Sequence, residues 1–184
     1  MVKTKIAVAG VLGRMGKNLI ESAKLNDVVE IVGVFDKSPI SEDHLVSFKL
    51  KSDIATTSDD AFDRADVVID FTSPSALFMF TESAIAHKAA LVVGTTGLEQ
   101  KHFNLLQQTS KATKIFYAPN MSLGVNSFFQ IARDTAAKLK DYDIEIIESH
   151  HKFKKDAPSG TAIKLGEEIA DQLGRTNKDF IFDR

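Results

Sequence analysis

The chain has 184 residues, of which 43% are hydrophobic and 26% are charged, and its formal net charge is -2. This composition is typical of a globular protein with a sizeable core, built as one large domain or two small ones. The near-neutral charge gives no reason to expect a nucleic-acid or membrane-surface partner. The absence of cysteine excludes disulfides, thiolate metal ligands and a thiol nucleophile, and it suits a cytoplasmic location.

The first predicted element is a buried strand over residues 6–9, followed by a glycine-rich turn and a helix. The turn has the spacing G-x-x-G-x-x-G from Gly10 to Gly16, and apolar residues follow it at helical spacing. Such a turn lets the backbone approach a pyrophosphate, which the helix N-terminus then holds. The spacing differs from the commoner G-x-G-x-x-G, so a strand-to-helix turn without a ligand is an equal alternative.

A second apolar run, over residues 28–35, ends at Asp36. Dinucleotide-binding folds place an acidic group near this point, where it accepts the adenosine ribose hydroxyls. Lys37 follows, and a cation there can hold a 2′-phosphate, so the pair indicates tolerance of both NADH and NADPH. The alternative is a solvated pair that opens a polar, turn-rich loop over residues 38–52.

Apolar runs and helical patterns then alternate. The predicted elements are, in order, a strand at 67–71, a helix at 74–88, a strand at 91–93, a helix at 98–112 and a strand at 115–117. This alternation predicts an α/β fold with a Rossmann-like, doubly wound parallel sheet and crossover helices. Ligands bind beyond the carboxyl ends of such strands, where residues 70–72, 94–97 and 118–121 fall. Strand-end turns also carry Gly, Thr and Asn for structural reasons alone.

The pattern changes after residue 121. We assign residues 1–121 to a dinucleotide-binding domain and residues 122–184 to the N-terminal part of a second, α+β substrate domain, which we expect to be incomplete at the C-terminus. Residues 122–141 predict an amphipathic helix that begins after Gly124, and residues 143–148 predict a strand. A further helix is expected from about Gly160 to Leu173, capped by Ser159 and ended by a glycine.

The segment from Glu148 to Ala162 combines two histidines, three lysines and a Ser-Gly-Thr helix start. A proton donor, a cation and free backbone N–H groups are what a small carboxylate substrate needs. Adjacent histidines without a cysteine or an H-E-x-x-H spacing do not favour a metal site, and no metal is predicted. His44, His87 and His102 are interpreted as structural or solvated.

Residues 150–162 read H-H-K-F-K-K-D-A-P-S-G-T-A, and they resemble the signature H-H-x-x-K-x-D-A-P-S-G-T-A of the bacterial dihydrodipicolinate reductase family. Residues 10–16, 70–72, 94–97 and 120–126 also resemble blocks of this family, in the family's order. The resemblance spans nearly the whole chain. On these motifs the chain is identified as a member of the family.

The resemblance implies hydride transfer from NADH or NADPH to a cyclic imine with two carboxylates, in the diaminopimelate route to lysine. It implies that His150 protonates the ring, that Lys154 holds or protonates the substrate and that His151 contacts it. Gly160 and Thr161 are implied to bind a carboxylate through the helix N-terminus. The implied cofactor contacts are Gly10, Val11, Leu12, Gly13, Arg14, Met15, Asp36, Lys37, Gly94, Thr95, Thr96, Ala118, Pro119, Asn120 and Met121.

The family's substrate domain extends past the position equivalent to Arg184 and supplies a sheet used in tetramer assembly. We therefore expect a fragment or a shortened variant, and a homotetramer at full length. A semialdehyde dehydrogenase would share the cofactor half, but the absent cysteine removes its nucleophile. A truncated, non-catalytic dinucleotide-binding module is the other alternative, and the intact block from His150 to Thr161 argues against it.

Overall fold

A computed structural model describes residues 2–152, 154 and 157–182 of the chain. Its tertiary contacts divide the chain into two units, Met1–Pro119 and Asn120–Arg184. The predicted domain boundary lies slightly further along, after residue 121, and the assignment of the parts to cofactor and substrate stays a prediction. Within the described ranges, no helix has both the length and the apolar character needed to cross a membrane.

The first unit is built on a sheet of five parallel strands. The strands are β1 (Thr4–Ala9), β2 (Val29–Phe35), β3 (Val67–Asp70), β4 (Ala90–Val93) and β5 (Ile115–Tyr117). Their order in the sheet is β2-β1-β3-β4-β5, and all neighbouring pairs are parallel. After β1 the chain first adds β2 on one side of it and then adds β3, β4 and β5 on the other side. The topological switch point therefore lies between β1 and β3. The predicted Rossmann-like parallel sheet is confirmed.

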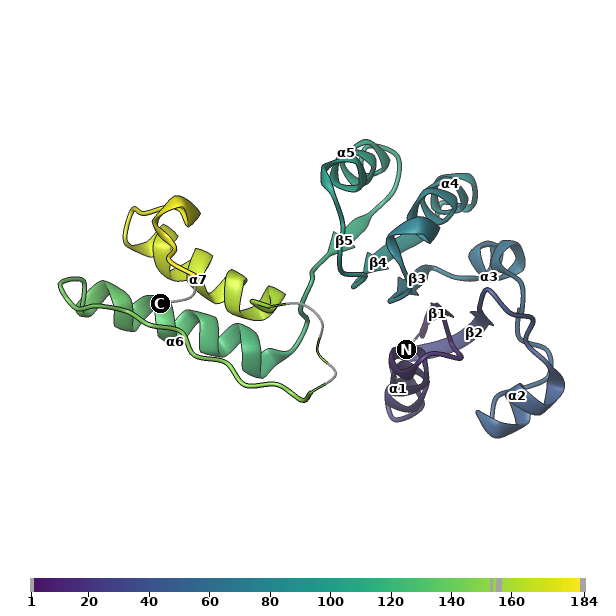
Figure 1. Ribbon diagram of the computed structural model, residues 1–184. Coiled ribbons are helices and arrows are strands. Elements are labelled where there is room, and N and C mark those ends of the chain that lie inside the picture. The colour runs from purple at the N-terminus through teal and green to yellow at the C-terminus, as the bar shows by residue number, and fades with distance from the viewer. Residues whose placement is uncertain (1, 153, 155–156, 183–184) are drawn as a thin grey trace. The chain divides into compact units, whose positions relative to one another are not determined.

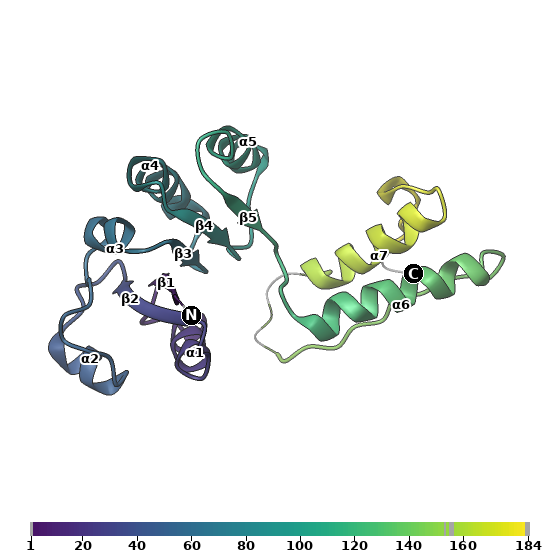
Figure 2. The same cartoon turned by 180° about the vertical axis from the view of Figure 1, so that it is seen from behind.

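Helices cover both faces of this sheet, as Figures 1 and 2 show. They are α1 (Arg14–Lys24), α2 (Glu42–Ser47), α3 (Ser58–Arg64), η1 (Pro74–Ala76), α4 (Leu77–His87) and α5 (Gln100–Thr109). Ala7 and Ala9 of β1 belong to the core that α3, α4 and α5 share. Val8 between them belongs to a second core with Ile20 of α1 and Leu45 of α2. Successive strand residues point to opposite faces, so one apolar run serves both cores.

Two short helices of the first unit were not predicted. The loop expected over residues 38–52 contains α2, which Ser41 begins through a capping box with His44. Thr57 caps α3 through the Asp60 amide. Each helix has fewer than eight residues, which is too short for an apolar period to stand out. Their starts are set by capping side chains. Ser and Thr are also common in loops, so these caps did not stand out in the sequence.

The other two histidines assigned to structural or solvated roles also make contacts of that kind. His102 completes a capping box with Glu99 at the start of α5. His87 at the end of α4 lies 3.1 Å from the Asp59 carboxylate of α3 and 3.5 Å from that of Asp63. Together with His44, they support helix ends and helix contacts in the first unit.

The second unit contains α6 (Leu123–Lys138), α7 (Gly160–Gln172) and the short η2 (Asn177–Asp179). Figures 1 and 2 show α6 and α7 side by side, and the segment that follows α6 in the sequence returns along α6 in an extended conformation. The predicted strand over residues 143–148 is wrong, since these residues are extended but form no strand. A strand requires a hydrogen-bonded neighbour, and none of the residues described in this unit provides one.

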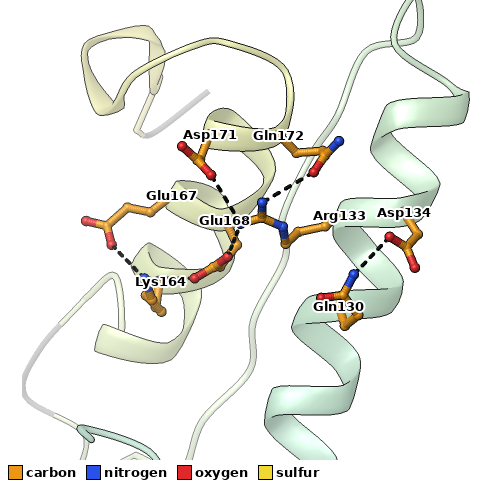
Figure 3. Close-up of polar contacts among 8 residues, drawn as sticks. All are labelled: Gln130, Arg133, Asp134, Lys164, Glu167, Glu168, Asp171 and Gln172. Carbon is orange, nitrogen blue, oxygen red and sulfur yellow. Dashed lines mark hydrogen bonds and ion pairs between the residues drawn. The ribbon is translucent and has the colours of Figure 1, made fainter. Parts of the chain in front are cut away.

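Polar contacts join α6 to α7, as Figure 3 shows. Arg133 of α6 places Nη1 2.5 Å from Oε2 of Glu168 and 3.2 Å from Oδ2 of Asp171, both on α7. Its Nη2 donates to Gln172 at 3.3 Å. Lys164 lies 2.8 Å from the other Glu168 oxygen. Since the Arg133 and Glu168 side chains are only 27% and 21% exposed, this network helps to fix α7 against α6.

Candidate active site

The glycine turn after β1 lies at the switch point of the sheet. Gly10 has a φ of +69°, which favours glycine, and its amide donates to the Phe35 carbonyl of β2 at 2.8 Å. A Cβ on Gly16 would lie 2.3 Å from the Gly10 carbonyl oxygen, so α1 packs too closely for any side chain there. The turn therefore brings the start of α1 directly against the end of β1.

The start of α1 is open to an anion. Gly13 is its N-cap residue, and no side chain among the described residues caps it. Its first N–H groups have no acceptor inside the helix, and the helix dipole makes this end partly positive. Arg14 and Met15 are exposed at the first helical positions. This arrangement fits a dinucleotide pyrophosphate, as the sequence predicts.

Asp36 lies beside the same turn, at the end of β2. Its Oδ2 accepts a hydrogen bond of 3.0 Å from the Leu12 amide, and the residue is half-buried. The carboxylate is therefore held at the glycine turn, where the adenosine ribose of a dinucleotide lies in folds of this kind. Lys37 is exposed next to it. Both positions fit the predicted cofactor contacts.

A buried carboxylate joins the ends of β3 and β4. Asp70 accepts hydrogen bonds from the Thr72 amide at 2.8 Å, the Thr72 hydroxyl at 2.6 Å and the Thr95 hydroxyl at 3.1 Å. Burial raises the pKa of the Asp70 carboxyl, although these hydrogen bonds favour its charged form. No individual role was predicted for Asp70 from the sequence. The feature that could have indicated such a role is the position of this carboxylate at the end of an otherwise apolar strand.

The predicted residues after β4 and β5 lie at this same edge of the sheet. Gly94 donates to the Asp70 carbonyl at 2.8 Å, and a Cβ on it would lie 2.1 Å from the Phe71 ring. Thr95 is buried in the Asp70 network, whereas Thr96 is exposed. The Ala118 amide donates to Val93 at 3.1 Å. The structure thus groups the Gly10 turn with the ends of β2, β4 and β5.

Pro119 ends the first unit and is exposed. Asn120 and Met121, the last two predicted cofactor contacts, belong to the second unit. The Asn120 side chain accepts a hydrogen bond of 2.9 Å from the Ser122 amide, just before α6 begins. Met121 is exposed. Their grouping with the other cofactor contacts stays a prediction.

In the second unit, Glu148 connects His150 with the start of α7. Its Oε2 lies 2.7 Å from Nε2 of His150, and its Oε1 accepts from the Ser159 amide at 2.7 Å. The Ser159 hydroxyl donates to Oε2 at 2.5 Å and accepts from the Ala162 amide at 3.1 Å, which caps α7. The hydrogen bond from the Ser159 hydroxyl, then that from His150, lower the pKa of Glu148 to about 2. No role was predicted for Glu148 from the sequence.

The remaining predicted substrate contacts lie near His150 and Ser159 in the sequence. Gly160 and Thr161 are exposed in the first turn of α7, where backbone N–H groups lack intrahelical acceptors. His151 is exposed, Lys154 is half-buried, and the Lys154 amide donates to the His151 carbonyl at 3.1 Å. Phe153, Lys155 and Asp156 of the motif lie outside the described residues. Within the described ranges, no group of three metal-ligating side chains is found.

Comparison with known proteins is consistent across sequence and fold. A family model described as dihydrodipicolinate reductase, N-terminus, matches residues 4–121, and one described as dihydrodipicolinate reductase, C-terminus, matches residues 124–182. The chain is 40% identical to 4-hydroxy-tetrahydrodipicolinate reductase of Colwellia psychrerythraea strain 34H. That alignment of 195 residues takes in 100% of this chain and 71% of the relative.

Two solved structures show the same architecture. Dipicolinate-bound dihydrodipicolinate reductase from Paenisporosarcina sp. TG-14 is 26% identical, with a TM-score of 0.75 over 100% of this chain and 71% of that chain. GenD2 from gentamicin A biosynthesis, in complex with NAD, is 19% identical. It has a TM-score of 0.58 over 74% of this chain and 41% of its own, a likeness of fold alone.

The parallel sheet, the glycine turn at its switch point and the open start of α1 are features of a dinucleotide-binding fold, and the comparisons indicate a dinucleotide-dependent oxidoreductase. Both family models and the 40% identical relative then identify the group within this class. The chain belongs to the dihydrodipicolinate reductase family.

Proposed function

We propose that this protein is a 4-hydroxy-tetrahydrodipicolinate reductase, which reduces a cyclic dicarboxylate imine in the diaminopimelate route to lysine. The observation that carries the proposal is the 40% identity to such a reductase over the whole chain, with the block from His150 to Thr161 intact. The dipicolinate named in the Paenisporosarcina structure is a ring with two carboxylates, the chemistry expected of the substrate.

In this proposal the first unit holds the cofactor. The start of α1 binds the pyrophosphate, and Asp36 accepts the ribose hydroxyls. Gly94 to Thr96 and residues 118–121 are the further proposed cofactor contacts. When bound, a reduced nicotinamide supplies a hydride. The exposed Lys37 beside Asp36 supports use of both NADH and NADPH, since a cation there can pair with a 2′-phosphate.

The second unit supplies the substrate contacts and the proton. The N–H groups of Gly160 and Thr161 bind one carboxylate, because the start of α7 is partly positive and anions are stabilised there. Lys154 pairs with the dianionic substrate, and His151 contacts it. His150 donates a proton to the ring as the hydride arrives, a role that imidazole suits near neutral pH.

A steady-state assay tests the function. Oxidation of NADH and of NADPH should require freshly generated substrate, and pyridine-2,6-dicarboxylate should inhibit by competing with it. Dinucleotide binding without any substrate-dependent oxidation would instead support the non-catalytic dinucleotide-binding module. A homotetramer and a cytoplasmic location, both expected from the family, stay proposals, and sedimentation and cell fractionation test them.

A further inference from the structure

The Glu148 carboxylate has two partners that serve different parts of the proposed site. One is the imidazole of His150, whose side chain is 39% exposed, and the other is the buried Ser159 that begins α7. The two partners are nine residues apart in the chain, with the lysine-rich part of the motif between them. A single carboxylate thus links the proposed proton donor to the helix start proposed to bind the substrate carboxylate.

The charge of Glu148 determines which nitrogen of His150 carries a hydrogen. Near neutral pH this carboxylate is ionised, because its pKa lies at about 2. An ionised carboxylate only accepts hydrogen bonds, so the 2.7 Å contact requires His150 to donate from Nε2. In the neutral ring Nδ1 then has the free lone pair, and it is the atom that gains a proton when the imidazolium forms.

We propose that Glu148 is a positioning residue for the reaction: it holds His150 in the Nε2–H tautomer beside the start of α7, so that Nδ1–H is the proton donated to the substrate. The identity of the reaction rests on the proposed function, whereas the tautomer and its cause do not. A carboxylate that orients a catalytic imidazole in this way fixes the direction of proton transfer.

The substrate ring gains one proton and one hydride in the proposed reaction. The Nδ1–H bond of the His150 imidazolium breaks, its electron pair stays on nitrogen, and the proton forms a new bond to the substrate ring. The hydride comes from the reduced nicotinamide, which becomes oxidised while the substrate is reduced. His150 is left as the neutral Nε2–H tautomer, still bonded to Glu148, and water returns the proton.

The first test measures the tautomer without any activity. Long-range ¹H–¹⁵N spectra distinguish Nε2–H from Nδ1–H imidazole, and the His150→Gln protein identifies the His150 signals. We expect the Nε2–H pattern in the unmodified chain at a pH where His150 is neutral. The Nδ1–H pattern at that pH would overturn the proposal. This measurement uses the unmodified chain, so it does not depend on the folding of a Glu148 variant.

Glu148→Gln is the matched change, since it keeps the shape and removes the charge. If its carbonyl oxygen keeps the Ser159 amide bond, its NH₂ group replaces Oε2 and donates to Nε2 of His150. His150 should then shift to the Nδ1–H tautomer. The control is Glu167→Gln, the same change on α7. The Glu167 carboxylate lies 4.0 Å from Lys164, and its replacement should leave the His150 spectrum unchanged.

Kinetics separate positioning from a structural role. For Glu148→Gln, kcat should fall by about 10-fold to 100-fold, a part of the 10²-fold to 10⁴-fold that a positioned general acid contributes. KM and the affinity for pyridine-2,6-dicarboxylate should change less than kcat, and Glu167→Gln should match the unmodified chain. A Glu148→Gln protein that keeps the Nε2–H tautomer and its kcat would overturn the proposal. A chain with no reductase activity but a Glu148-dependent tautomer would instead contradict only the proposed function.

Discussion

The Asp70 carboxylate of β3 accepts a hydrogen bond of 3.1 Å from the Thr95 hydroxyl that follows β4, and both residues are buried. Thr95 also accepts from the Thr72 amide at 2.9 Å, so two strand ends are tied together at the edge of the sheet proposed to bind the cofactor. The predicted cofactor contacts from Gly94 to Thr96 are therefore positioned in part by the Asp70 carboxylate. Because Asp70 is buried, it depends on these hydrogen-bond donors.

Thr95→Val tests this connection because it keeps the side-chain shape and removes the hydroxyl. Asp70 then loses a donor while remaining buried, and the Thr72 amide loses an acceptor. The free energy of unfolding should fall by about 1–3 kcal/mol, as measured by urea denaturation, and dinucleotide affinity should weaken. Thr4→Val, at an exposed position in β1, should change neither quantity. Equal effects of the two substitutions would contradict a role for the Asp70 network.

Gly94→Ala should show that this glycine is required by packing against Phe71. The added Cβ would lie 2.1 Å from the Phe71 ring, so the ring or the backbone must move. We expect a loss of about 1–3 kcal/mol in the free energy of unfolding, together with weaker dinucleotide binding. Phe71→Ala should relieve the clash, so the double variant should lose less stability than the two single losses added together. Additive losses would show that the two residues do not interact.

The sequence predicted the sheet well because each of the five strands is an apolar run followed by turn residues, and the order of elements then restricts the topology. The prediction from sequence was wrong where an element needs a partner elsewhere in the chain to form. Residues 143–148 have the composition of a strand, yet they pair with no other strand in the part of the chain described. The role of Glu148 was missed for a related reason, since its contact with Ser159 joins residues 11 positions apart in the chain.

Glu148 should also make stability depend on pH. Its pKa is about 2 in the folded chain, against an ordinary value of 4.5, so the folded state favours the charged form. The resulting stabilisation is fully present above pH 4.5 and is lost as the pH falls through about 2. The difference in melting temperature between the unmodified chain and Glu148→Gln should therefore shrink as the pH is lowered through this range. A difference that stays constant would contradict the low pKa.

Arg133 should stabilise the contact between α6 and α7. Arg133→Ala leaves Lys164 as the ion-pair partner of Glu168 among the described residues, and it removes the contacts to Asp171 and Gln172. We expect a lower melting temperature, with a difference that decreases in high salt because part of the attraction is screened. Arg175→Ala, beyond the end of α7 at an exposed position, is the control. A melting temperature unchanged by Arg133→Ala at low salt would show that the network contributes nothing to stability.

We propose that His150 and Lys154 carry the chemistry while other residues hold the cofactor. Substrate-dependent oxidation of NADH and NADPH by His150→Gln and Lys154→Ala tests it most directly, with dinucleotide affinity measured on the same samples and Lys138→Ala, at the exposed end of α6, as the control. We expect kcat to fall by about 10²-fold to 10⁴-fold in His150→Gln and strongly in Lys154→Ala, with dinucleotide affinity unchanged. Turnover retained in both variants would contradict it.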